Sequence, residues 1–159
     1  MPATSASGQD PDRVASALAV CLPALNRALD RRVGQDLGLP KPSEAQIALL
    51  TLVARQEGIT VRQAADALLM RANNVSTLVS QLTERGLLER RQDPADKRIA
   101  HLHPTAKARR ELAEVHRLQR EHLTLALQFL TDGERDALGS AVGALTSLTR
   151  HLRPASPAE

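Results

Sequence analysis

Between Thr60 and Lys107 the sequence predicts two short helices, joined by a tight turn and followed by a charged β-hairpin. Thr60 and Gln63 have the spacing of a capping box, in which each side chain bonds the free amide of the other residue at a helix start. Asn73 is expected to cap the second helix, and Gly86 to end it. This order of elements is how a protein places one helix in the major groove of DNA and an arm beside it.

The second of these helices has two unlike faces. Val75, Leu78 and Val79 recur at the spacing of a buried helical stripe, which Leu82 extends by one turn. The opposite face carries small, uncharged polar residues, whereas an ordinary solvent-exposed face more typically carries Glu and Lys. Asparagine and glutamine can pair bidentately with adenine, and serine and threonine contact phosphates or bases. In this context the face predicts contact with DNA through Asn73, Asn74, Ser76, Thr77, Ser80 and Gln81.

The hairpin concentrates positive charge near its turn. Strands are expected at 88–91 and 99–103, around the turn-rich stretch from Asp93 to Asp96. Lys97 and Arg98 would lie at the tip, where they can enter the minor groove of DNA. Asp96 is expected to hold the Arg98 guanidinium by charge-assisted hydrogen bonds. The alternative is an ordinary surface turn with salt bridges, which contribute little to stability.

Charge is distributed unevenly along the chain. Residues 85–110 hold eight basic and three acidic side chains, although the net charge of the whole chain is only +3. Such a basic segment suggests a polyanion-binding edge, and a solvated charged surface is the equally weighted alternative. Four further arginines are expected to contact the phosphate backbone or the groove edges and complete the candidate DNA-binding set: Arg62, Arg71, Arg90 and Arg91.

The composition restricts the core. The 159-residue chain is 42% hydrophobic but has one Phe, no Trp and no Tyr. The core must therefore be aliphatic, which favours packed helices over an aromatic-rich β-sandwich. The near-absence of aromatic rings also argues against a binder of single-stranded nucleic acid, which uses such rings to stack bases.

The remaining chain predicts further helices, so the expected fold class is mainly α with a small β-hairpin. Apolar stripes predict helices over 12–33, with a kink near residues 19–23 because of Pro23, and over 105–130 and 132–152. Capping boxes at Ser43 with Gln46, and at Thr131 with Glu134, predict two helix starts. The tails at 1–11 and 154–159 are small and polar and are expected to be disordered.

The chain resembles the MarR family of winged-helix transcriptional regulators over roughly residues 12–152. Asp96-Lys97-Arg98, followed by the stretch from Leu102 to Lys107, is similar to the family's wing pattern. The stretches 73–79 and 84–88 resemble the opening and the exit of the family's recognition helix. The chain departs from the pattern in the His103-Pro104 insertion before Thr105, and in Ala108, where a glycine is common.

The resemblance implies a single domain over 12–153, with a winged helix-turn-helix lobe at 43–103 and dimerisation helices at 12–40 and 105–153. A homodimer would contact double-stranded DNA, each lobe taking one half of a near-palindromic site. The resemblance further implies a transcriptional regulator, expected to be a repressor, that a small-molecule effector releases from DNA. Apolar stripes on the terminal helices favour such a dimer independently, because bundling between chains would bury them.

Cys21 supports an alternative, because one branch of the family senses organic hydroperoxides through a cysteine in its first helix, activated by tyrosine hydroxyls. This chain has no Tyr. Cys21 lies in an apolar stripe beside Pro23, so a buried structural cysteine is expected and a redox sensor is the alternative. A winged-helix module that binds effectors or proteins without DNA is a further alternative.

Other classes of site are not expected. His101 and His103 share a strand face and are expected on the solvent side of the wing, while His116 and His122 lie off a common helical face. The sequence therefore predicts no metal site, and it predicts no cofactor. A single cysteine without an evident base gives no catalytic arrangement, so no enzyme is expected. No signal segment and no membrane-length apolar run is evident, which predicts a cytoplasmic protein.

Overall fold

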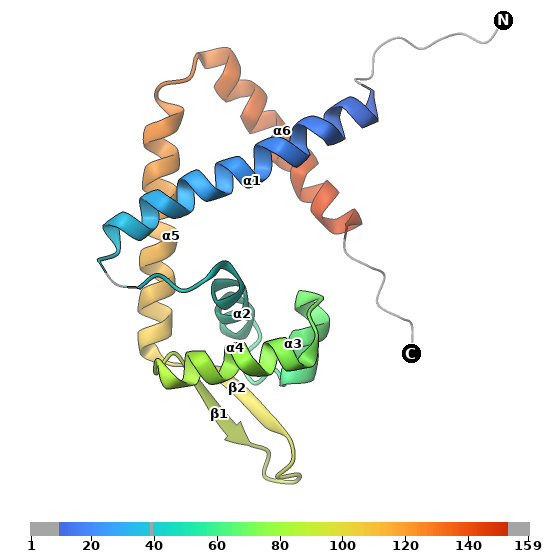
Figure 1. Cartoon of the computed structure of the whole chain (residues 1–159), viewed down its shortest axis with the longest axis vertical. Coiled ribbons are helices and arrows are strands. Elements are labelled where there is room, and N and C mark those ends of the chain that lie inside the picture. Colours follow the sequence, from blue (N-terminus) through green and yellow to red (C-terminus); the bar gives the residue numbers. More distant parts are fainter. Residues whose placement is uncertain (1–9, 39, 153–159) are drawn as a thin grey trace, which may run out of the picture. The chain divides into compact units, whose positions relative to one another are not determined.

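A computed structural model describes residues 10–38 and 40–152, and its elements in those ranges are six helices and one two-stranded hairpin. The mainly helical fold with a small β-hairpin is thereby confirmed. The chain divides into two compact units, Met1–Gln119 and Arg120–Glu159, so the boundary lies inside the fifth helix. In chain order the elements are α1 (Pro11–Asp36), α2 (Glu44–Arg55), α3 (Val61–Leu68), α4 (Ala72–Glu84), β1 (Leu88–Gln92), β2 (Ala100–Pro104), α5 (Ala106–Leu127) and α6 (Asp132–His151) (Figure 1).

Helix α1 begins one residue before its predicted start. The Asp10 carboxylate accepts a hydrogen bond from the Asp12 backbone N–H, and Pro11 occupies the first helical position. That position suits proline, because its missing N–H would have had no partner inside the helix. The helix continues through Pro23 as one element. Of the tails predicted to be disordered, residues 1–9 and 154–159 lie outside the described part of the chain.

An aliphatic core holds α2, α3, α4 and the hairpin together. Its fully buried side chains come from elements far apart in sequence, among them Leu50 of α2, Leu82 of α4 and Leu102 of β2. A smaller cluster forms around Val33 of α1 and Val115 of α5. The buried hydrophobic residues are Val, Leu, Ile and Ala throughout the described ranges, as the near-absence of aromatic residues predicted.

The three predicted capping boxes are all present. Ser43 and Gln46 open α2, Thr60 and Gln63 open α3, and Thr131 and Glu134 open α6, each pair with both of its reciprocal hydrogen bonds. Because a capping box needs only residues three positions apart, it can be recognised from sequence alone.

The turn between α3 and α4 differs from the prediction. Leu69 adopts a left-handed conformation with φ 56°, which ends α3, and Arg71 rather than Asn73 is the N-cap of α4. The Arg71 carbonyl accepts hydrogen bonds from the N–H groups of Asn74 and Val75. Asn73 therefore lies inside the first turn of α4, and its exposed side chain is not used as a cap.

The wing is an antiparallel hairpin in which Leu88 pairs with Pro104 and Gln92 with Ala100. The other edge of β2 bonds the loop between α2 and α3: Gly58 N–H donates to the Leu102 carbonyl and Leu102 N–H to the Ile59 carbonyl, both at 2.9 Å. Gly58 has φ +88°, a conformation that side-chain-bearing residues rarely adopt. These bonds hold the base of the wing against the helical lobe.

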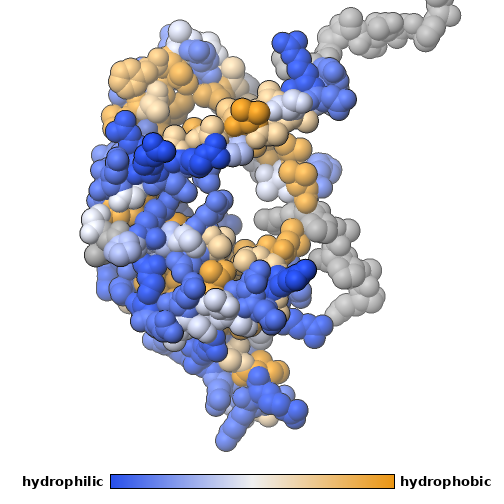
Figure 2. Space-filling model, viewed as in Figure 1, coloured by the Kyte–Doolittle hydropathy of each residue, from blue (hydrophilic) through white to orange (hydrophobic). Residues whose placement is uncertain are grey.

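In residues 120–152 the helices leave apolar side chains exposed. No residue of α6 is buried, and Leu138, Val142 and Leu148 are 48%, 59% and 40% exposed. Apolar surface also covers the end of α5 and the turn after it, at the top of the view in Figure 2. Among the described helices, none has the length and apolar content needed to cross a membrane.

Candidate nucleic-acid interface

Helix α4 has the two faces that the sequence predicted. Val75, Val79 and Leu82 are completely buried and attach the helix to the core. All six residues assigned to the opposite face are exposed: Asn73, Asn74, Ser76, Thr77, Ser80 and Gln81. The face is thus rigidly backed and open to a partner, and the assignment of these residues to DNA contact stays a prediction.

Two hydroxyl groups of this face bond the helix backbone. Thr77 Oγ1 donates to the Asn73 carbonyl at 3.0 Å, and Ser80 Oγ donates to the Ser76 carbonyl at 3.1 Å. With their protons directed inward, these oxygens present lone pairs outward. Arg90 Nη2 donates to Ser80 Oγ at 3.2 Å, so the structure brings together a strand residue and a helix residue that were predicted separately. This bond ties β1 to α4.

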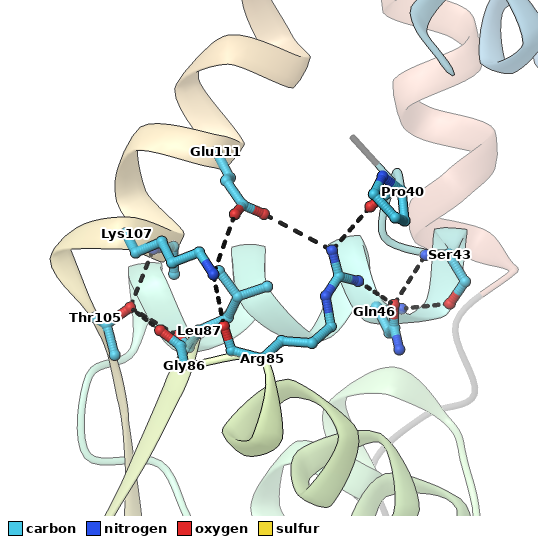
Figure 3. A network of polar contacts seen from close by, with 10 residues as sticks. Pro40, Ser43, Gln46, Arg85, Gly86, Leu87, Thr105, Lys107 and Glu111 are labelled. Carbon is cyan, nitrogen blue, oxygen red and sulfur yellow. Dashed lines mark hydrogen bonds and ion pairs between the residues drawn. The ribbon is translucent and has the colours of Figure 1, made fainter. Parts of the chain in front are cut away.

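The C-terminal end of α4 is held by a polar network that sequence reasoning missed (Figure 3). The Arg85 guanidinium donates to the Pro40 carbonyl at 2.9 Å and to Gln46 Oε1 at 3.2 Å, and it lies 4.0 Å from the Glu111 carboxylate. Arg85 therefore connects the end of α4 to α2, to the loop before α2 and to α5. The one local signal was a basic residue directly before the helix-ending Gly86.

Lys107 of α5 and Thr105, the residue just before that helix, complete this network. Lys107 Nζ donates to the Arg85 carbonyl at 2.8 Å and lies 3.9 Å from Glu111. Thr105 Oγ1 donates to the Gly86 carbonyl at 2.8 Å. Arg85 and Lys107 were counted in the basic segment 85–110, but Arg85 is largely covered and Lys107, although 54% exposed, is held by the Arg85 carbonyl and by Glu111. Charge at the wing tip is more available to a polyanion.

The wing tip is shaped by its two aspartates. Asp93 Oδ1 accepts hydrogen bonds from the N–H groups of Ala95 and Asp96, at 2.7 and 3.1 Å. Asp96 Oδ1 accepts a hydrogen bond from the Arg98 N–H at 3.0 Å, whereas Arg98 Nε lies 3.6 Å away. The expected hydrogen-bonded clamp on the guanidinium is therefore replaced by a bond to the backbone. The Arg98 side chain is 95% exposed.

The other candidate arginines differ in their surroundings. Arg91 bonds the neighbouring Glu89 carboxylate at 3.2 Å, which offsets part of its charge. Arg62 and Arg71 are exposed, as is the candidate lysine Lys97. The wing end of the molecule, at the bottom of the view in Figure 2, is largely hydrophilic. The exposed basic side chains of the wing tip are those of Lys97 and Arg98.

The sequence predicted His101 and His103 on the solvent side of the wing, but the structure places both against the rest of the protein. His101 Nδ1 lies 2.6 Å from the Gly58 carbonyl and its Nε2 lies 2.9 Å from Asp93 Oδ2. His103 Nδ1 lies 3.3 Å from the Glu57 carboxylate, which also bonds Arg109 at 2.8 Å. The alternation of the strand was correct, but this face of the wing packs on the loop between α2 and α3.

The two acceptors around His101 favour its charged form. A hydrogen bond with Asp93, and then one with the Gly58 carbonyl, raise the pKa of His101 above its ordinary value. The same contact with His101 lowers the pKa of Asp93, and the contact with His103 lowers the pKa of Glu57. A protonated imidazole can donate from both ring nitrogens, so His101 can bond Gly58 and Asp93 at once.

The structure corrects the expectation for Cys21, which is exposed rather than buried in the single chain. Among the residues that the structure describes, no group of three or more His, Cys, Asp or Glu side chains could hold a metal ion.

Comparison with known proteins places these features in context. A profile of the MarR family matches residues 37–99, which include α2, α3, α4, β1 and the wing turn. The uncharacterized HTH-type transcriptional regulator YkoM of Bacillus subtilis (strain 168) is 29% identical over 93 residues, which span 58% of this chain and 60% of YkoM. The match thus covers about three fifths of that relative's length.

Solved structures share the fold. One is FabT of Streptococcus pneumoniae in complex with DNA, with a TM-score of 0.68 at 20% identity. The match covers 90% of this chain and 99% of the FabT chain. The PcaV transcriptional regulator of Streptomyces coelicolor, in complex with its natural ligand, has a TM-score of 0.55 at 20% identity, covering 82% of this chain and 94% of PcaV.

Proposed function

We propose that this chain, whose residues 37–99 match the MarR family and whose fold is that of the FabT structure, is a transcriptional regulator of that family and binds double-stranded DNA sequence-specifically as a homodimer. Helix α4 enters the major groove and the wing tip lies in the neighbouring minor groove. Each subunit contacts one half of a near-palindromic operator. The protein acts there as a repressor, and a small-molecule effector lowers its affinity for DNA.

The observation that carries this proposal is the pairing of two unlike surfaces. The exposed face of α4 offers short polar side chains that can reach base edges and phosphates, with Glu84 as its only acidic residue. The wing tip adds Lys97 and Arg98, with the Arg98 side chain almost fully exposed. An exposed arginine suits a narrow minor groove, where the negative potential is strongest. The FabT complex with DNA supports the same use of this fold.

The homodimer is supported by apolar side chains on the helices outside the core. On α1, Val20, Leu22 and Leu25 are 74%, 43% and 52% exposed. On α6, Leu138 and Val142 are about as exposed. Full burial of one such side chain is worth about 1.5–3 kcal/mol, so covering these faces in a symmetric interface would stabilise a pair of chains.

Release by an effector is supported by a ligand-bound structure of the same fold and by a surface hollow on α1. PcaV was solved with its natural ligand, which supports ligand binding by this fold. In this chain a surface hollow of about 560 Å³ along α1 is lined by Arg27, Arg31 and Arg32 together with small and amide side chains. Three arginines suit an anionic effector. Small carboxylates that lower DNA affinity in a titration would support this part, and unchanged affinity with a panel of such acids would count against it.

The exposure of Cys21 favours a second candidate, a redox-responsive regulator, over a purely structural cysteine. The chain has no Tyr to activate the thiol. Peroxide treatment followed by thiol titration and a DNA-binding assay separates the two: a redox regulator loses thiol and changes affinity together.

The central test is a selection of duplexes from a random-sequence pool by the full chain, followed by affinity measurement on the enriched duplex. The proposal expects an enriched near-palindrome, bound by two chains much more tightly than an unrelated duplex. A pool that stays random after several rounds, at low salt, would overturn it. A winged-helix module that binds effectors or proteins without DNA would leave the pool random.

A further inference from the structure

The side chain of Gln46, near the start of α2, is hydrogen-bonded at both ends. Its Oε1 accepts a bond from the Ser43 backbone N–H at 3.0 Å and one from Arg85 Nη1 at 3.2 Å (Figure 3). Its Nε2 donates to Gln81 Oε1 on α4 at 2.9 Å. Gln46 thus lies between an arginine of the internal network and a residue of the candidate DNA-binding face.

The direction of each bond follows from the chemistry of the groups. A backbone N–H and a guanidinium can only donate, so the oxygen of Gln46 must face Ser43 and Arg85. The Gln46 NH₂ group is then directed at Gln81, and since it can only donate, it requires the oxygen of Gln81 as its acceptor. The orientation of the Gln81 amide is therefore set by donors that it does not touch.

The start of this chain of bonds is firmly held. The Arg85 guanidinium also bonds the Pro40 carbonyl and lies beside Glu111, and only 31% of its side chain is exposed. Gln46 is half-buried, and its backbone N–H is capped by Ser43. For the Gln81 side chain, no other hydrogen bond is recorded within residues 10–38 and 40–152. Its NH₂ group is left with both hydrogens available.

We propose that the series Arg85–Gln46–Gln81, called here the amide relay, makes Gln81 a hydrogen-bond donor toward DNA and sets what that position of α4 can read. This inference rests on the proposed function. A free glutamine reads adenine by donating to N7 while accepting from the N6 amino group. Because its oxygen is directed at Gln46, Gln81 presents its NH₂ group outward and donates to acceptors, namely a phosphate oxygen or the O6 and N7 atoms of guanine.

The relay can be reversed by one nearly isosteric change, Gln46→Glu. The new carboxylate still accepts from Ser43 and Arg85, and glutamate is a favoured residue at this position of a capping box, so α2 keeps its start. Its second oxygen cannot donate to Gln81. The Gln81 amide must then turn its NH₂ group inward and present its oxygen to the DNA, so that an acceptor faces the DNA acceptor to which the wild-type side chain donates.

The test is a double-mutant cycle on the duplex that the wild-type full chain selects from a random pool. Affinities are measured for the wild type, Gln46→Glu, Gln81→Ala and the double variant, with thermal unfolding as a check on the fold. The relay predicts that Gln46→Glu weakens binding about tenfold when Gln81 is present, a loss typical of one reversed base or phosphate contact. In the Gln81→Ala background the same change should alter affinity less than about twofold.

The background comparison separates the relay from simple charge repulsion, because an added carboxylate would repel DNA with or without Gln81. Equal losses in both backgrounds, or no loss in either, would overturn the relay. Gln46→Ala is the second variant: it frees the Gln81 amide to rotate, so its smaller loss should also disappear in the Gln81→Ala background. These failures differ from failure of the proposed function, in which the wild type enriches no duplex at all.

Discussion

Replacing Arg98 at the wing tip by alanine tests DNA binding with little disturbance of the protein. The Arg98 side chain is 95% exposed, and its one recorded side-chain contact is the 3.6 Å approach to Asp96. The hydrogen bond between the Arg98 N–H and Asp96 uses the backbone, so Arg98→Ala retains it. The free energy of unfolding should therefore change by no more than about 0.5 kcal/mol.

The expected effect on DNA binding follows from counterion release. Each cation that neutralises a phosphate contributes about 0.9 to the slope of log affinity against log salt concentration. A dimer with two wings should lose about 1.8 from this slope in the Arg98→Ala variant. Over a tenfold rise in salt, the affinity of the wild type should then fall about 60-fold more than that of the variant.

Fluorescence anisotropy of the selected duplex, measured at several salt concentrations, gives both the affinity and the slope. Arg13→Ala is the matched control, because Arg13 is also exposed but lies on α1, outside the winged lobe. It should leave the slope unchanged. If Arg98→Ala matches the control in both affinity and slope, the assignment of the wing tip to DNA is wrong.

Three further changes test other parts of the account. Val142→Asp places a charge on the apolar face of α6, where Val142 is 59% exposed, and should convert the dimer to monomers, as measured by light scattering. Ser140→Asp, on the opposite side of the helix, should leave the dimer intact. A Val142→Asp variant that remains dimeric would contradict the proposed interface. The raised pKa of His101 means that its contribution to stability is complete below about pH 6.5, its ordinary value, and is lost as pH rises through the raised pKa. The difference in unfolding free energy between the wild type and His101→Gln, measured in urea, should thus shrink from pH 6 to pH 8, while Asp93 and Glu57 stay ionised. A difference that does not change with pH would refute the stabilisation by protonated His101. Leu82→Ala removes a completely buried side chain of α4 and should cost about 2–5 kcal/mol of unfolding free energy; a loss below about 1 kcal/mol would show that the core does not hold this helix as described.

Features that depend on neighbouring residues could be predicted from the sequence. The capping boxes at Ser43, Thr60 and Thr131 and the turn at Gly86 all depend on contacts within a few positions. The buried stripe of α4 follows from helical periodicity, so its exposed face could be named as well. The hairpin was placed within a residue because turn-forming residues separate its two strands.

Features that depend on distant partners were missed or misplaced. Arg85 meets Gln46 and Pro40, which lie 39 and 45 positions away, so no local pattern indicated the network. The same reason hid the contacts of His101 with Gly58 and of His103 with Glu57. The N-cap of α4 was placed at Asn73 because asparagine is a good cap, but the left-handed Leu69 ends α3 in a way that makes Arg71 the cap.

A hydroxyl-radical footprint of the full chain on its selected duplex tests the central claim most directly. Two identical winged lobes in a symmetric dimer should protect two equivalent segments, with their centres one helical turn of about 10–10.5 base pairs apart, or a whole multiple of it. A single protected segment, two segments off that spacing, or cleavage unchanged by the protein would contradict the account.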